Sequence, residues 1–250
     1  MPVNPIADQI RLYARHLRIP TFAEYQDILR RMKPDDTFDE LLLECMKAES
    51  IQRQENQNRR RLKAAAFPYH KVLDDLDVTR YAGSISALFL NELASCQFIT
   101  DKKNIVMIGN PGRGKTHLAI ALGLKACALG FDVLFKNAAA LSTELMEAKD
   151  NYTLGRLEKR IQKAELLIID ELSYISFNRH QSELLFKVIS ERTERGSVIV
   201  TTNLSFSQWT ELFENTAMVA ALVDRLTFQS YILDMNGESY RLEQSLKNRK

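Results

Sequence analysis

A phosphate-binding loop is the feature of this sequence that most restricts its fold. Residues 109–116 read Gly-Asn-Pro-Gly-Arg-Gly-Lys-Thr and match the pattern G-x-x-x-x-G-K-[ST] at every fixed position. An apolar run over 105–108 precedes the loop, and a helical pattern over 117–129 follows it. This strand–loop–helix context predicts an α/β fold, because such a loop cradles phosphates between a strand end and a helix N-terminus.

Each part of the loop has a chemical role toward a nucleoside triphosphate. The glycines let backbone N–H groups turn inward around the phosphates, Lys115 reaches the β- and γ-phosphates, and the Thr116 hydroxyl ligates Mg²⁺. The alternative is a glycine-rich turn before a buried helix, which the complete match in context disfavours. The predicted nucleotide-binding residues are therefore Gly109, Asn110, Pro111, Gly112, Arg113, Gly114, Lys115 and Thr116.

A second apolar segment ends in two carboxylates. Four apolar residues precede Asp170 and Glu171, as expected for a strand buried on both faces of a parallel sheet. Ligands bind such sheets at the carboxyl ends of strands, so Asp170 is placed to hold Mg²⁺ and Glu171 to activate water as a general base. An exposed Asp-Glu pair opening a turn is the alternative. The sequence contains neither Asn-Lys-x-Asp nor His-Arg-Asp, which favours ATP hydrolysis over GTP binding or protein phosphorylation.

A third segment supplies an amide. Residues 197–202 are mostly β-branched and end in Thr-Thr, and Asn203 follows them. Next to the phosphates, the Asn203 amide would hold the attacking water and sense the γ-phosphate. On its own the pattern is more often an ordinary strand-ending turn, but the two preceding motifs favour the functional role.

The arrangement of patterns along the chain predicts two domains. Capping boxes at Thr21–Glu24 and Thr37–Glu40, with prolines that end helices, indicate a small all-helical domain over 1–67 whose third helix is basic. From residue 68 to 250, strands alternate with helices, which predicts a five-stranded parallel sheet with right-handed crossovers. The expected strands lie near residues 104–108, 133–135, 166–169, 198–201 and 231–234.

Composition excludes several classes of protein. Of the 250 residues, 45% are hydrophobic and 26% are charged, as in ordinary globular proteins. The apolar runs are short for a membrane span, and the N-terminus lacks the apolar core of a signal peptide. Cys45, Cys96 and Cys127 are scattered without metal-ligand spacing, which favours packed, reduced cysteines in a bacterial cytoplasm.

Basic residues gather in the third helical segment. Residues 47–71 hold seven Lys and Arg against two acids, although the net charge of the chain is only +2. Such clustering suggests a footprint for a polyanion, whereas a solvated helix face is the alternative. The candidate DNA-binding residues are Arg53, Arg59, Arg60, Arg61 and Lys63.

Arg225 is the remaining candidate for the active site. It lies near the end of a helical stretch over 217–228, just before the last strand. An arginine at such an edge can reach a neighbouring subunit's γ-phosphate and stabilise transition-state charge. Pairing with Asp224 or Asp234 is an equally good interpretation of the sequence. Only about sixteen residues follow the last strand, so no helical lid domain is expected.

These motifs together resemble an AAA+ ATPase and, more narrowly, the IstB family of transposition helper ATPases, close relatives of the DnaC helicase loaders. The resemblance covers nearly the whole chain and includes residues 109–118, 167–172, 201–204 and 224–226. The segments that narrow it to IstB are Arg59-Arg60-Arg61 with Phe67-Pro68, and Gly237-Glu238-Ser239-Tyr240. Arg113 departs from the family pattern, which usually has threonine there.

The resemblance implies a function that the residues alone do not give. It implies a cis site formed by Lys115, Thr116, Asp170, Glu171 and Asn203, a trans-acting Arg225, and an interface contribution from Arg192. It also implies assembly with ATP on double-stranded DNA as a head-to-tail oligomer, which deforms the DNA and presents it to a transposase of the same element. The residues alone leave a helicase loader and a nucleotide-gated DNA scaffold open, whereas a small-molecule P-loop kinase lacks support.

Overall fold

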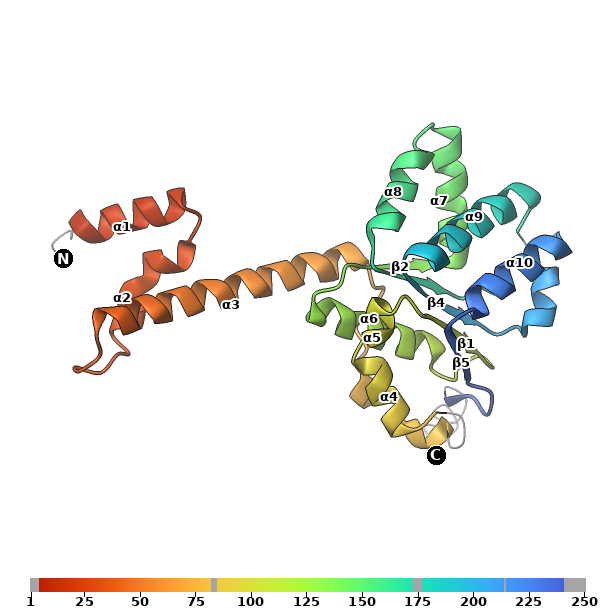
Figure 1. Cartoon of the computed structure of the whole chain (residues 1–250), viewed down its shortest axis with the longest axis horizontal. Coiled ribbons are helices and arrows are strands. Elements are labelled where there is room, and N and C mark those ends of the chain that lie inside the picture. Colours follow the sequence, from red (N-terminus) through yellow and green to blue (C-terminus); the bar gives the residue numbers. More distant parts are fainter. Residues whose placement is uncertain (1–4, 82–84, 173–176, 214, 241–250) are drawn as a thin grey trace, which may run out of the picture. The chain divides into compact units, whose positions relative to one another are not determined.

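The computed structural model describes residues 5–81, 85–172, 177–213 and 215–240. The chain forms two compact units, Met1–Arg60 and Arg61–Lys250, whereas the sequence predicts a boundary after residue 67. Helix α3, Phe38–Ala65, runs through this division (Figure 1). The division falls inside the helix because Ala65, Leu62 and Phe67 belong to the hydrophobic core of the second unit.

The first unit is helical, as predicted. It contains α1 (Pro5–His16), a 3₁₀ segment (Pro20–Glu24), α2 (Tyr25–Leu29) and the first part of α3. The predicted capping box at Thr37 is confirmed, because the Glu40 amide donates to the Thr37 hydroxyl and the Thr37 amide donates to the Glu40 carboxylate. The predicted box at Thr21 is wrong. Its hydroxyl donates to Glu49 of α3 at 2.6 Å, so it joins two elements of the unit.

The second unit is built on the five predicted strands. They are β1 (Asn104–Ile108), β2 (Val133–Asn137), β3 (Leu166–Asp170), β4 (Ser197–Thr202) and β5 (Ser230–Asp234). All neighbouring strands pair in parallel, in the order β2-β3-β4-β1-β5. Since β1, β3 and β4 are central, the loops that follow them open at one edge of the sheet, where ligands of α/β proteins bind.

Helices cover both faces of the sheet (Figure 1). Alternate residues of each central strand point to opposite faces. Ile168 belongs to the hydrophobic cluster that includes residues of α4 (Ala87–Ala94), α5 (Gln97–Thr100) and α6 (Lys115–Leu129). Leu167 belongs to the cluster on the other face. That second face carries α7 (Ala138–Asp150), α8 (Leu154–Lys163), α9 (Arg179–Arg195) and α10 (Thr216–Thr227). Buried hydrophobic side chains fill the space between the sheet and the helices on both faces.

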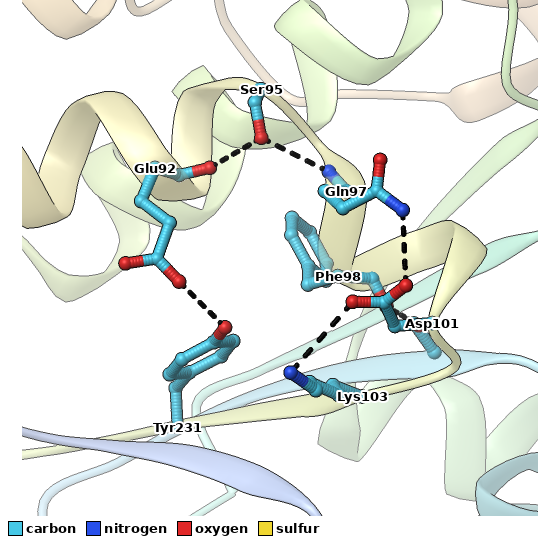
Figure 2. Close-up of polar contacts among 8 residues, drawn as sticks. Glu92, Ser95, Gln97, Phe98, Asp101, Lys103 and Tyr231 are labelled. Atoms are coloured by element: carbon cyan, nitrogen blue, oxygen red, sulfur yellow. Dashed lines mark hydrogen bonds and ion pairs between the residues drawn. The ribbon is translucent and has the colours of Figure 1, made fainter.

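A polar cluster fastens the edge strand β5 to α4 and α5 (Figure 2). The Tyr231 hydroxyl donates to the Glu92 carboxylate at 2.8 Å, and the Lys103 ammonium lies 5.5 Å from the centre of the Tyr231 ring. Lys103 also pairs with Asp101 at 3.7 Å. These contacts hold the strand from which the segment 235–240 continues to the nucleotide site.

The cysteines are packed, as predicted. Cys45, Cys96 and Cys127 are buried free thiols, and burial raises the pKa of Cys96 and of Cys127 to about 11. Within the described ranges, no helix has the length and apolar character that a membrane span requires.

Candidate nucleotide-binding site

The predicted phosphate loop connects β1 to α6. Gly112 and Gly114 adopt positive φ angles of 77° and 84°, a backbone conformation that glycine reaches without strain. A Cβ atom on Gly114 would lie 2.7 Å from the Tyr81 hydroxyl, so a larger residue would also collide. Gly114 ends the loop at the N-terminus of α6, where unpaired N–H groups and the helix dipole favour an anion.

Lys115 is held inside the loop. Its ammonium donates to the carbonyls of Gly109 at 2.5 Å and Asn110 at 2.9 Å, and to the Asn203 side-chain oxygen at 2.6 Å. The side chain is buried, although it is charged. The structure thus brings together two residues that lie far apart in the sequence and that were both predicted for this site.

Thr116 and Asp170 meet at the carboxyl end of β3. The Thr116 hydroxyl donates to Asp170 Oδ1 at 2.9 Å, and the Thr201 hydroxyl donates to the same oxygen at 2.6 Å. Burial raises the pKa of the Asp170 carboxyl, and these two hydrogen bonds oppose the rise. Asp170 therefore presents a fixed, largely buried carboxyl group beside the hydroxyl of the loop threonine.

Glu171 occupies a constrained turn directly after β3. Its φ is 60°, which is uncommon for a non-glycine residue, and its amide donates to the Thr201 hydroxyl at 2.9 Å. Asn137, at the end of β2, donates from its side-chain nitrogen to Glu171 Oε2 at 3.0 Å. Asn137 was not predicted from the sequence. Its side chain also caps the N-terminus of α7, and nothing in the sequence of β2 distinguishes it from an ordinary helix cap.

One cleft of about 460 Å³ lies along the phosphate loop. Lys115, Thr116, Glu171 and Asn203 form its phosphate end. The cleft continues past the loop to residues that the motifs did not indicate, namely Tyr69, Lys71, Asp75, Leu76, Asp77, Arg80, Tyr81 and Tyr240. Tyrosine rings and carboxylates are groups that can stack on a base and accept hydrogen bonds from it.

The three arginines predicted for the ATPase site have different surroundings. Arg113 turns its guanidinium away from the loop interior, onto backbone carbonyls. Arg225 is an exposed residue of α10 with its guanidinium 6.0 Å from the Phe186 ring, and it is not among the residues that line the cleft. Arg192 is buried and donates to the carbonyls of Gln162 and Glu165, so its predicted interface role is wrong. Burial also lowers the pKa of the Arg192 guanidinium.

The predicted DNA-binding residues lie on α3 and fall into two groups. Arg53 pairs with Glu49 at 2.7 Å, and Arg61 lies 3.7 Å from Asp132. Arg59, Arg60 and Lys63 are exposed, and their spacing of three and four residues puts them on one side of the helix.

Comparison with known proteins identifies the family of this chain. Residues 14–248 match the family of IstB-like ATP binding proteins. The chain is 40% identical over 187 residues to the ATP-binding protein named for insertion sequence IS21 in Pseudomonas aeruginosa, which covers 75% of this chain and 70% of that protein. It is 34% identical to its counterpart for insertion sequence IS5376 in Geobacillus stearothermophilus, over 95% of both chains.

Solved structures share the fold. A crystal structure of DnaI matches 68% of this chain and 90% of its own with a TM-score of 0.54 at 18% identity. The DnaC helicase loader matches 70% of this chain and 98% of its own with a TM-score of 0.51 at 21% identity. The α/β fold with its five-stranded parallel sheet is therefore shared with these proteins, and the family description adds ATP binding. The chain belongs to the family of IstB-like ATP binding proteins.

Proposed function

We propose that this protein hydrolyses ATP as a head-to-tail oligomer on double-stranded DNA and that it presents the deformed DNA to the transposase of its own insertion sequence. The observation that carries the enzymatic part is the convergence of Lys115, Thr116, Glu171 and Asn203 on one cleft, with Asp170 hydrogen-bonded to Thr116 beside it. Membership of an insertion-sequence family supports the biological role.

The oxygen atoms of Thr116 and Asp170 fit a magnesium ion. A hydroxyl and a carboxylate oxygen 2.9 Å apart are the hard oxygen donors that Mg²⁺ prefers, and it commonly binds through few protein ligands plus the phosphates of a nucleotide. When bound, Mg²⁺ would neutralise developing charge on the phosphates. Lys115 would leave the loop carbonyls for the β- and γ-phosphates, and the backbone N–H groups at the start of α6 would hold the remaining oxygens.

Glu171 is the proposed general base. Its carboxylate is exposed at the cleft and would accept a proton from the attacking water, which the Asn203 amide would help to orient. The hydrogen bond from Asn137 fixes one carboxylate oxygen and leaves the other for the water. The constrained backbone at Glu171 and the Thr201 hydroxyl hold the carboxylate at the strand end.

We propose duplex DNA as the partner of α3. Arg59, Arg60 and Lys63 supply three positive charges on one side of the helix, and cations spaced along a helix suit the evenly spaced phosphates of a duplex. Arg53 and Arg61 would contribute less, because each is already close to a carboxylate of this chain.

Replacing Arg59, Arg60 and Lys63 with alanine is expected to weaken duplex binding equally for unrelated sequences. Each lost phosphate contact should reduce the slope of log affinity against log salt by about 0.9, so the slope falls by up to about 2.7. Fluorescence anisotropy of a labelled duplex at several salt concentrations measures it. Alanines at the exposed Arg156, Lys159 and Arg160 of α8 remove the same charge and serve as the control. An unchanged slope in the α3 variant would mean that its basic side is merely solvated.

Two other functions compete with this proposal: a helicase loader, and a nucleotide-gated DNA scaffold with little hydrolysis. The likeness to DnaC and DnaI concerns the fold, so it does not favour loading. ATP turnover of the purified protein with and without duplex DNA separates the enzyme from the scaffold, because the scaffold binds ATP and DNA but releases almost no phosphate. Stimulation by single-stranded DNA alone would favour the loader.

Variants of Arg225 can test the proposed head-to-tail assembly. It is exposed and outside the cleft of its own chain, which supports a role at a neighbour's γ-phosphate. Arg225→Ala should bind ATP normally but lose about a thousandfold in DNA-dependent turnover, as arginine fingers do. Mixed with Lys115→Ala protein, it should regain part of that activity, because each Lys115→Ala subunit still offers Arg225 to a neighbour that binds ATP. If the two variants co-assemble and the mixture stays inactive, the arginine acts in cis or elsewhere.

A further inference from the structure

Arg113 occupies a variable position of the phosphate loop, yet its side chain is almost fully buried. The guanidinium donates three hydrogen bonds to backbone carbonyls: to Arg80 at 2.6 Å, to Glu238 at 3.0 Å and to Met235 at 3.2 Å. Its Cζ atom also lies 5.1 Å from the centre of the Tyr81 ring. The planar fork of an arginine suits several divergent acceptors, whereas lysine offers one point charge.

The three acceptors belong to two segments that wrap the loop from outside. One is the turn Val78–Tyr81, whose Tyr81 hydroxyl donates back to the Arg113 carbonyl. The other is 235–240, which follows β5. Its Tyr240 amide donates to the Gly112 carbonyl at 3.1 Å, and the Asn110 side chain donates to the Gly237 carbonyl at 3.2 Å.

The fit between these segments is tight. A Cβ atom on Gly237 would lie 2.9 Å from Cζ of Arg113, and one on Gly112 would lie 2.2 Å from the Ser239 hydroxyl oxygen. Both glycines also have positive φ angles. Arg113 is thus the centre of a junction at which residues from three parts of the chain leave no room for larger side chains.

The junction packs against the outside of the phosphate loop and also contributes side chains to the wall of the cleft. Arg80, Tyr81 and Tyr240 all line the cleft, and the Arg80 guanidinium stacks 5.0 Å from the centre of the Tyr240 ring. Side-chain hydrogen bonds of Lys115 and Thr116 go instead to residues at or just after the ends of β1, β3 and β4, including Gly109, Asp170 and Asn203. A change in the junction should therefore alter the walls of the cleft around the nucleoside more than the phosphate cradle.

We propose that Arg113 is a positioning residue that builds the nucleoside end of the ATP site, by fastening Tyr81 and Tyr240 beside the phosphate loop. This inference rests on the proposed function only in taking ATP as the ligand. It assigns the segment 235–240 to the nucleotide site, as a wall joined to the loop by a buried arginine. It also gives Arg113 a role through protein carbonyls and not through the phosphates.

The test compares two ligands that share phosphates but differ in the nucleoside. Affinity for a fluorescent ATP analogue is measured directly, and affinity for inorganic triphosphate is measured by competition. Arg113→Thr should weaken ATP binding about tenfold and leave triphosphate binding unchanged, because hydrogen bonds from a charged group contribute enough for such a loss. Arg113→Lys should behave like Arg113→Thr, since it keeps the charge without the fork. Arg179→Thr, an exposed arginine of α9, is the matched control.

A double variant tests the route through the tyrosine. Tyr240→Ala should show the same ATP-selective loss, and adding it to Arg113→Thr should cost little more, because both changes remove one shared element. Losses that multiply to about a hundredfold would show independent roles and overturn the inference. Equal losses for ATP and triphosphate, or no loss at all, would overturn it as well. If Arg113→Thr does not fold, Tyr240→Ala decides alone. Wild-type protein that binds neither ligand would instead refute the proposed function.

Discussion

Lys115→Ala is expected to lower ATP affinity by at least about a hundredfold. The ammonium makes three hydrogen bonds within the loop, to two carbonyls and to Asn203, and it would exchange these for phosphate oxygens. Two hydrogen bonds from a charged donor to phosphates contribute about 3–6 kcal/mol, which corresponds to that loss or more. Isothermal titration or the fluorescent ATP analogue measures it.

The control for this variant is Lys125→Ala. Lys125 lies on the same helix, α6, but its side chain is exposed, so ATP affinity should not change. Because Lys115 also holds the loop together, a thermal unfolding curve of the Lys115→Ala protein should accompany the titration. A folded Lys115→Ala protein with undiminished ATP affinity would contradict the assignment of the loop.

Glu171→Gln is expected to retain ATP but to lose DNA-dependent turnover by about a hundredfold to ten-thousandfold, the usual contribution of a general base. The amide has the shape of the carboxylate, and its oxygen can still accept the hydrogen bond from Asn137. The neutral amide cannot take a proton from the attacking water, so bound ATP and the assembly on DNA should persist. Phosphate release and the lifetime of the protein on a labelled duplex are the two measurements.

Glu147→Gln offers a matched control, since Glu147 is an exposed residue of α7 and the change removes the same charge. Its turnover should equal that of the wild type. Normal turnover by Glu171→Gln would assign the base to another residue. Loss of ATP binding by Glu171→Gln would point to a contribution of its charge to the nucleotide complex.

Much of the second unit could be predicted from the sequence because its signals are local. The apolar runs ending at Ile108 and Ile169 are too short for buried helices and lie beside turn residues, so they indicate buried strands. The parallel order follows from the intervening helices. The phosphate loop fixes which strand end holds the ligand. Thr116 and Asp170 could then be placed together, although 53 residues separate them.

The residues that were missed or wrongly interpreted depend on tertiary contacts. Thr21 has the spacing of a capping box with Glu24, but a carboxylate on α3 competes for its hydroxyl. Arg192 looks like any surface arginine of a helix, and only the close approach of the β3 and β4 starts buries it. Asn137 reaches Glu171 because of the order of strands in the sheet, and Tyr240 reaches the cleft because of the path of the chain after β5. No local pattern encodes either.

The single tryptophan of the sequence is an optical reporter for the second unit. Trp209 is completely buried beside Phe206, with ring centres 5.4 Å apart, and it follows Asn203 by six residues. Residues 1–60 contain no tryptophan. Tryptophan fluorescence therefore records the unfolding of the second unit and does not respond to melting of the N-terminal helices. Circular dichroism records helix loss in both units. The difference between the two melting curves thus reports the stability of the first unit.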